Sequence, residues 1–67
     1  MNFHHTSVRE FREGQRVALH PAVDLWMRGC RFGTVVRVRG RYVDVDVDGY
    51  GRSRFRPWAI AILPEDE

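Results

Sequence analysis

The clearest pattern in the chain is an alternation of apolar and charged positions within residues 31–56. Val43, Val45 and Val47 occupy every second position of one segment, with aspartates between them, and similar alternation flanks it on both sides. Successive side chains of a β-strand point to opposite faces of its sheet, so a period of two predicts strands with one buried and one solvated face. Two glycine-containing turns divide the stretch, which therefore predicts three antiparallel strands.

The first turn, Gly40-Arg41, fits a two-residue type II′ hairpin with glycine first. The pairs that this turn places opposite each other are Val38 and Val43, Val36 and Val45, Arg37 and Asp44, and Arg39 and Tyr42. The alternation breaks once, at Val35-Val36, where both positions are apolar. A β-bulge is expected there, because an extra residue restores the alternation and bends the strand.

The second turn, Gly49-Tyr50-Gly51, fits a three-residue loop whose last glycine takes the left-handed conformation. The expected pairs are Asp48 and Arg52, Asp46 and Arg54, Asp44 and Arg56, and Val45 and Phe55. Three acids then meet three bases, with Arg37 also opposite Asp44. Each exposed cross-strand pair contributes only about 0.2–1 kcal/mol, so the ladder mainly specifies the register of the strands.

The flanking segments predict two further strands and two short turns. Residues 7–11 have the form of a capping box with one helical turn, in which Val8 and Phe11 share a face and plug one end of the fold. Strands are expected at 16–20, with Val17 and Leu19 inward, and at 60–63, after a 3₁₀ turn over Pro57-Trp58-Ala59. Residues 1–6 are expected to fray, and 64–67 to form an acidic tail.

Five short strands, one long first connection and two tight hairpins predict a single all-β domain, a small five-stranded SH3-like barrel with a short N-terminal helical turn. Gly14-Gln15-Arg16-Val17, the run Arg-Gly-Cys-Arg-Phe-Gly-Thr-Val at 28–35, and Val43-Asp44-Val45 resemble the KOW-type pattern of SH3-like modules in ribosomal proteins and transcription factors. The resemblance covers roughly residues 14–47, and it implies binding to nucleic acid or ribonucleoprotein. Gly29 and Gly33 are separated by three residues, where that family has two.

Two other resemblances concern shorter segments. His20-Pro21-Ala22 and Arg28-Gly29 are similar to segments of short proteins encoded by tailed phages. The layout is also similar to that of the plasmid-borne type II dihydrofolate reductases, SH3-like barrels that act as tetramers around one pore. Their Val-Gln-Ile-Tyr pore segment falls on Ser53-Arg54-Phe55-Arg56, where none of the four residues matches, so reductase activity is not carried over.

Composition narrows the class of protein. A chain of 67 residues has room for one domain and a small core. Its single cysteine, Cys30, excludes an intramolecular disulfide, and it has no apolar run of membrane length and no secretion signal, so a cytoplasmic protein is expected. All 11 basic residues are arginine, and without the last three acids the net charge is +5, which is compatible with binding nucleic acid.

Metal, cofactor and catalytic sites are not expected. Asp44, Asp46 and Asp48 would stand about 6–7 Å apart along one strand and fan outward, too far apart to close on one ion. The potential zinc ligands His4, His5, His20 and Cys30 lack any paired spacing. Because no catalytic triad, phosphate loop or converging carboxylate pair is present, the sequence predicts a non-enzymatic binding module.

The candidate binding residues flank glycine turns, where a phosphate can approach the backbone closely. Arg37, Arg52, Arg54 and Arg56 could follow phosphates across the sheet, but the central aspartates are expected to neutralise most of them. The remaining candidates, in the long first loop and the hairpin tips, are Trp26, Met27, Arg28, Arg31, Arg39, Arg41 and Tyr50. Arginines would contact phosphates of RNA or DNA, and Trp26 and Tyr50 would stack on bases. Trp58 is expected to pack on the core, and Tyr42 to lie over Arg39.

The rival interpretation is a protein-binding adaptor, for example a phage factor acting on a host protein. Trp26 and Met27 would then serve as apolar anchors. A third interpretation is a reductase-like enzyme, which would need a tetramer.

Overall fold

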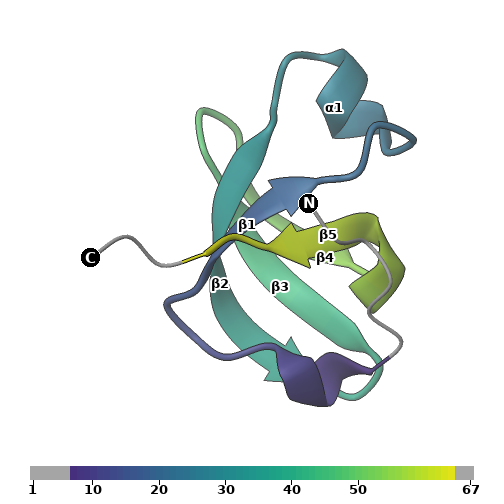
Figure 1. Ribbon diagram of the computed structural model, residues 1–67. Helices are drawn as coiled ribbons and strands as arrows, with labels where there is room; N and C mark the ends of the chain where they lie inside the picture. The colour runs from purple at the N-terminus through teal and green to yellow at the C-terminus, as the bar shows by residue number, and fades with distance from the viewer. Residues whose placement is uncertain (1–6, 65–67) are drawn as a thin grey trace.

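The computed structural model describes residues 7–64. The segment expected to fray, which includes His4 and His5, and the three acids of the tail lie outside this range. The described chain forms one antiparallel sheet of five strands, in the order β4-β3-β2-β1-β5. The strands are β1 (Arg16–Leu19), β2 (Phe32–Arg39), β3 (Tyr42–Val47), β4 (Gly51–Phe55) and β5 (Ile60–Ile62) (Figure 1). The all-β prediction with five strands is therefore confirmed.

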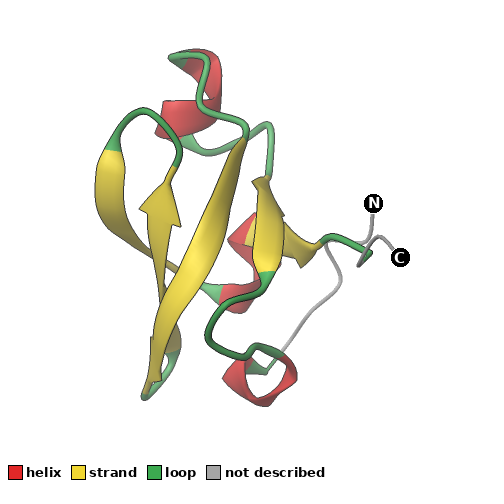
Figure 2. Cartoon of the chain, turned by 90° about the vertical axis from the view of Figure 1, so that its left-hand side faces the viewer, coloured by secondary structure: helices red, strands yellow, loops and turns green. Residues whose placement is uncertain are grey.

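Three short helices connect or precede the strands. The 3₁₀ helix η1 (Val8–Glu10) begins after Ser7, which is its N-cap as predicted. The Ser7 Oγ accepts a hydrogen bond of 3.1 Å from the backbone N–H of Arg9, and not from that of Glu10 as a capping box would have it. A single α-helical turn, α1 (Asp24–Met27), lies in the long first connection, and η2 (Pro57–Ala59) precedes β5. Helix α1 lies at one end of the molecule, and η1 and the β2–β3 turn lie at the other (Figure 2). In the described part of the chain, no helix is long and apolar enough to cross a membrane.

The core lies on the inner side of the sheet and consists mainly of branched aliphatic side chains. Its largest fully buried members are Leu19, Ile60, Val17, Val35, Val43, Val45 and Val47. Phe11 is buried against them and Val8 packs alongside, as predicted from their common face. The prediction for Trp58 is wrong, because its side chain is 53% exposed. The short 3₁₀ turn directs its neighbours Pro57 and Ala59 inward instead, and the Trp58 ring lies edge-on against His20.

The first hairpin has the predicted register at its tip. Arg37 pairs with Asp44, Val38 with Val43 and Arg39 with Tyr42. Gly40 has a φ of 58° and Arg41 does not have a positive φ, as a type II′ turn requires. The predicted bulge is present between Val35 and Arg37, and beyond it Val35 faces Val45. The expected pairing of Val36 with Val45 is therefore wrong, because the extra residue shifts the partner by one.

The second hairpin is shifted by two residues from the expected register. Asp44 pairs with Arg54, Asp46 with Arg52, Val43 with Phe55 and Val45 with Ser53, so the expected partners of Asp44, Asp46, Asp48 and Val45 are wrong. The predicted loop Gly49-Tyr50-Gly51 is also wrong, because Gly51 already belongs to β4 and pairs with Val47, which leaves Asp48-Gly49-Tyr50 as the three-residue loop. The Asp48 backbone N–H donates to the carbonyl of Phe32 in β2 at 3.0 Å. A shift of two residues leaves every side chain on its predicted face.

Gly33 allows the central strands to approach closely. It lies opposite Val17 of β1 and Val47 of β3. A Cβ atom at this position would lie 2.5 Å from Val45 Cγ1 and 2.8 Å from the carbonyl oxygen of Asp46. Any larger residue would therefore push β3 away from β2.

Candidate nucleic-acid interface

The outer face of the sheet carries most of its charged side chains. Alternation along β2, β3 and β4 places the outward residues in three rows across the strands. The rows are Thr34–Asp46–Arg52, Arg37–Asp44–Arg54, and Arg39–Tyr42 with Arg56 beyond the end of β4. Arg16 extends the first row onto β1, because it pairs with Thr34.

Charge is distributed unevenly between the two ends of this face. We use "Gly40 end" for the residues near the β2–β3 turn, namely Arg37, Arg39, Arg41, Tyr42, Asp44, Arg54 and Arg56. We use "Gly49 end" for the residues near the β3–β4 turn, namely Arg16, Asp46, Asp48 and Arg52. Two arginines balance two aspartates at the Gly49 end, whereas five arginines face one aspartate at the Gly40 end.

The single acid of the Gly40 end is largely removed from solvent. The side chain of Asp44 is 10% exposed, and its Oδ1 lies 3.3 Å from Nε of Arg54, whose side chain is 55% exposed. Arg37 lies directly opposite Asp44 on β2. The Asp44 carboxylate is therefore paired with Arg54, and the Arg54 side chain still remains accessible to solvent.

Tyr42 lies at the centre of the Gly40 end and is half-buried. The guanidinium carbons of Arg56 and Arg54 lie 4.8 and 5.5 Å from the centroid of its ring. Arg56 Nη2 also donates to the Tyr42 hydroxyl at 3.3 Å. The expectation that Tyr42 lies over Arg39 is therefore corrected: the shifted register of β4 brings two other arginines to the ring.

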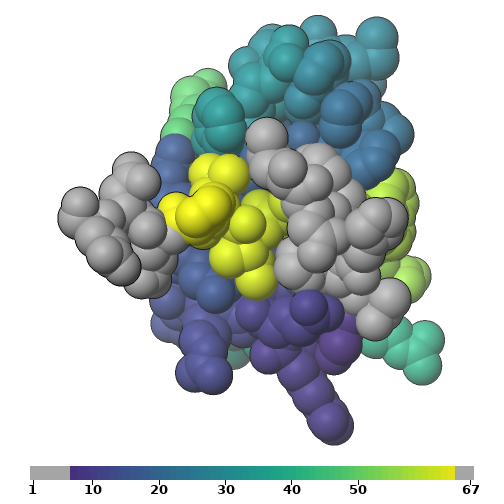
Figure 3. Space-filling model, viewed as in Figure 1, coloured from purple at the N-terminus to yellow at the C-terminus, as the bar shows by residue number. Residues whose placement is uncertain are grey.

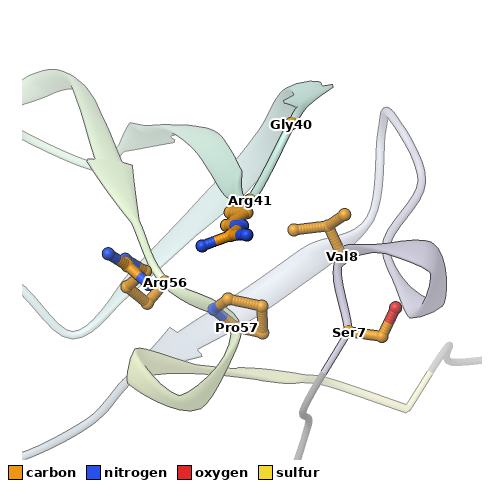
Figure 4. Close-up of a pocket in the computed structure, with 6 residues that line it drawn as sticks. All are labelled: Ser7, Val8, Gly40, Arg41, Arg56 and Pro57. Carbon is orange, nitrogen blue, oxygen red and sulfur yellow. The ribbon is translucent and has the colours of Figure 1, made fainter.

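A shallow hollow of about 270 Å³ adjoins the Gly40 end. Its lining residues are Ser7, Val8, Gly40, Arg41, Arg56 and Pro57 (Figure 4). The Arg41 side chain extends between Val8 and Arg56, and the Ser7 hydroxyl, which caps η1, points away from the hollow (Figure 4). The β2–β3 turn also protrudes beside η1 on the molecular surface (Figure 3). Two cationic groups therefore border a site that is open to solvent.

At the Gly49 end the charges are paired. Arg16 donates from Nη1 and Nη2 to Oδ1 and Oδ2 of Asp48 at 3.0 and 2.5 Å, and from Nη1 to Thr34 Oγ1 at 3.0 Å. This two-pronged contact is the strong geometry for an arginine and a carboxylate. The hydrogen bond from Arg16 holds the pKa of the Asp48 carboxyl below its ordinary value, and the same bond raises the pKa of Arg16.

The predicted residues of the long first loop are partly engaged with one another. Trp26 is half-buried against the core, and the Arg31 guanidinium carbon lies 3.5 Å from the centroid of its ring. Arg28 Nε lies 3.5 Å from Asp24 Oδ2. Met27, by contrast, is 79% exposed. The loop thus offers one open apolar side chain, and much of its charge is already in contact with neighbours.

The structure divides the predicted set of binding residues between two ends of the molecule. Trp26, Met27, Arg28 and Arg31 lie around α1, and Tyr50, which is 55% exposed, lies in the β3–β4 turn. Arg39 and Arg41 lie at the β2–β3 turn, which the length of β2 separates from α1 by up to about 23 Å. The predicted residues therefore do not form one site.

The residues that join Arg39 and Arg41 at the Gly40 end were assigned from sequence to the neutral ladder. Arg37 and Asp44 have their predicted partners across the first hairpin, but Arg54 and Arg56 have different ones. The spacing of arginines in β4 signalled a charged face, but the charge balance at each end depends on the register of the second hairpin.

The described residues include no group of three or more histidine, cysteine, aspartate or glutamate side chains that could hold a metal ion. Cys30, a free thiol, packs against the core and is half-buried.

Comparison of this chain with known protein families, curated proteins and solved structures gives no match. No protein-family model matches it. No curated protein and no solved structure gives a significant match either.

Proposed function

We propose that this protein is a non-enzymatic SH3-like module that binds nucleic acid, alone or within a ribonucleoprotein, through the Gly40 end. The observation that carries the proposal is the surplus of five arginines over one buried aspartate on one exposed surface. Arginine presents its N–H donors in a planar fork that fits phosphate oxygens, and it stays charged at any physiological pH. The site of action would be the cytoplasm, that of a host cell if the gene is carried by a phage.

The proposal predicts a strong dependence of affinity on salt. Each phosphate neutralised by an arginine releases condensed counterions, so affinity for a duplex falls with salt at a logarithmic slope of about −0.9 per contact. Three to five contacts from the Gly40 end correspond to a loss of about 40-fold to 500-fold between roughly 50 and 200 mM salt.

A pair of charge-matched variants tests the proposal. One variant carries Arg39→Gln, Arg41→Gln and Arg56→Gln at the Gly40 end. The other carries Arg28→Gln, Arg31→Gln and Arg52→Gln, and so loses the same net charge at the opposite end. Fluorescence anisotropy with labelled DNA and RNA, over a series of salt concentrations, gives the affinity of each.

We expect the Gly40-end variant to lose most of its affinity and its salt slope to become shallower by about 2.7, while the matched variant stays close to wild type. Equal losses in the two variants would show that net charge alone drives binding. Absence of binding by the wild-type protein at low salt would refute the function itself.

A protein-binding adaptor is the second candidate function, and the exposure of Met27 supports it. Phe32, at the start of β2, is also 41% exposed. Trp26 is a weaker anchor than expected, because Arg31 covers its ring and the core holds its other side. A partner that copurifies in stoichiometric amount, is lost with Met27→Ser and is retained by the Gly40-end variant would favour the adaptor over nucleic-acid binding.

A further inference from the structure

The aromatic ring of the Gly40 end is already engaged by arginine. Arg54 and Arg56 lie over the Tyr42 ring, and Arg56 also holds its hydroxyl group. Proteins that bind single strands rely on exposed rings, on which each stacked base contributes about 1–3 kcal/mol. A base would have to displace two guanidinium groups to reach Tyr42, so this ring is poorly suited to stacking.

Among residues 7–64, the exposed aromatic side chains lie away from the Gly40 end. Tyr50 belongs to the turn at the opposite end of the outer face, and Phe32 begins β2 near that same end. Trp58 lies edge-on to His20, with 5.9 Å between ring centroids, and does not line the hollow beside Arg41. A single strand on the Gly40 end would therefore meet arginines without a free stacking surface.

The arginines of the Gly40 end form two rows with one strand between them. The β2 row consists of Arg37, Arg39 and Arg41, which follow β2 into its turn, and the β4 row consists of Arg54 and Arg56. Because neighbouring strands lie about 4.7–4.9 Å apart, the backbones of the two rows are roughly 9.5 Å apart. The spacing of the backbones equals neither groove width of B-DNA, about 6 and 12 Å, so a contact across a groove depends on the reach of the long arginine side chains.

The β3 strand, which lies between the two rows, disfavours a nucleic-acid backbone that runs along its centre. Asp44 projects from β3 between the two rows, with its carboxylate beside Arg54 Nε. Because this carboxylate is 10% exposed and paired with Arg54, it only weakens the attraction for a phosphate directly above β3, and positions beside the two rows are the more favourable ones. Phosphates of two different strands, one on each row, satisfy that arrangement.

From this geometry we infer that the Gly40 end lies across a groove of a nucleic-acid duplex, with the β2 row on the phosphates of one strand and the β4 row on those of the other. The inference rests on the proposed function and specifies its ligand. Contacts to phosphates position a protein without reading bases, so binding is independent of sequence.

The test compares duplexes with single strands of the same sequence. A labelled DNA duplex, an RNA duplex and their separate strands are titrated with the wild-type protein by anisotropy between about 50 and 200 mM salt. We expect at least one duplex to bind more tightly than either of its strands. Because a single strand engages one row of two or three arginines, its salt slope should be about −1.4 to −2.1, against about −4.5 for a duplex that engages all five.

Three further variants distinguish duplex binding from base stacking. Arg39→Gln, in the β2 row, and Arg56→Gln, in the β4 row, should each lower the duplex slope by about 0.9, because both rows take part. The double variant Tyr50→Ala with Trp58→Ala should leave duplex affinity within about twofold of wild type. Its circular dichroism spectrum and urea midpoint confirm that it is folded.

Each outcome bears on the inference in a distinct way. Tighter duplex binding with both rows contributing supports it. Tighter single-strand binding, or a tenfold loss in the aromatic double variant, overturns it while the proposed function stands. Failure of the wild-type protein to bind any of the nucleic acids at low salt overturns the proposed function, and the inference with it.

Discussion

The two ends of the outer face belong to one sheet and both carry arginine and aspartate, but they differ in charge. At the Gly49 end, Arg16 grips Asp48 through two hydrogen bonds, and Asp46 lies opposite Arg52. At the Gly40 end, Asp44 is the one carboxylate among five arginines. The first end is a neutral part of the scaffold, and the second is a cationic surface.

The difference arises from the register of one hairpin. In the register expected from the turn sequence, Arg56 would face Asp44 and Arg52 would face Asp48. In the observed register, Asp48 is bound to β1 through Arg16, and Arg56 lies beside Tyr42 instead of an acid. A shift of two residues keeps the inner and outer faces unchanged but moves positive charge toward the Gly40 end. Register, and not composition, therefore decides where positive charge accumulates on the outer face.

The largest effect is expected from Gly33→Ala, compared with Gly40→Ala. Gly33 lies beneath the Gly49 end, and an added Cβ would meet Val45 Cγ1 and the backbone oxygen of Asp46. We expect a loss of about 3 kcal/mol in the free energy of unfolding, the upper end of the usual range for overpacking, because the backbone oxygen of Asp46 cannot rotate out of the way. A single core of this size rarely supplies more than roughly 3–5 kcal/mol, so Gly33→Ala should be close to unfolded in water.

Gly40→Ala serves as the matched variant at the other end. Nothing lies within 4 Å of a Cβ added at Gly40, and its cost is the left-handed backbone conformation, about 1–2 kcal/mol. Urea titration followed by tryptophan fluorescence gives both values. If Gly33→Ala lowered the free energy of unfolding no more than Gly40→Ala, the close packing of β2 on β3 would not determine the structure of the Gly49 end.

The next effect concerns Asp44→Asn, which should change stability and binding in opposite directions. Loss of the one negative charge among five arginines should lower the free energy of unfolding by about 1 kcal/mol at low salt, and less as salt screens the repulsion. The same loss should tighten duplex binding about fivefold, because roughly 1 kcal/mol of repulsion toward phosphate disappears. Urea titration and anisotropy measure the two effects on one protein.

Asp46→Asn is the control for this prediction. Asp46 is exposed at the Gly49 end and lies opposite Arg52. Its change should shift the free energy of unfolding by no more than about 0.5 kcal/mol and affinity by less than about twofold. Equal gains in affinity from Asp44→Asn and Asp46→Asn would mean that the Gly40 end is not a distinct binding surface.

The strands and their faces could be predicted from the sequence because a period of two is a local property. Val43, Val45 and Val47 point inward whichever residues lie opposite them. The first hairpin could be predicted from its turn as far as Arg37, since a two-residue turn with Gly40 allows few geometries, but the bulge beyond it changes the partner of Val45. The bulge followed from two adjacent valines that could not both face inward.

The second hairpin could not be predicted because the turn sequence fits two three-residue loops, Asp48-Gly49-Tyr50 as observed and Gly49-Tyr50-Gly51 as expected. Asp48 is bound by Arg16, which is 32 residues away in the sequence, and nothing in the turn itself indicates that partner. The predicted site is incomplete for the same reason, because the expected register pairs Arg54 and Arg56 with aspartates and so excludes them from the binding residues. Trp58 was misplaced for a similar reason: which residue of a one-turn helix faces the core depends on how the turn is docked.

The smallest effect, but the most specific to the Gly49 end, is the pH dependence of the Asp48 contact. The hydrogen bond from Arg16 lowers the pKa of Asp48 in the folded state, relative to about 3.9 in the unfolded chain. A carboxyl group with a depressed folded pKa stabilises the protein above its unfolded pKa, and that stabilisation is lost as the pH falls through the folded pKa. The urea midpoint of the wild type should therefore exceed that of Asp48→Asn at neutral pH. The two midpoints should converge below about pH 4, as the carboxyl becomes protonated.

Arg16→Gln provides the double-mutant cycle for this contact. In the Arg16→Gln background, Asp48→Asn should change the urea midpoint by the same small amount at neutral and at acidic pH, since the partner that depresses the pKa is gone. The backbone hydrogen bond from Asp48 to Phe32 persists in every variant, so the β3–β4 turn itself should stay intact. A difference between wild type and Asp48→Asn that persists undiminished at acidic pH would show that the substitution disturbs the turn. In that case the ion pair with Arg16 would not be what neutralises the Gly49 end, and its contrast with the Gly40 end would need another cause.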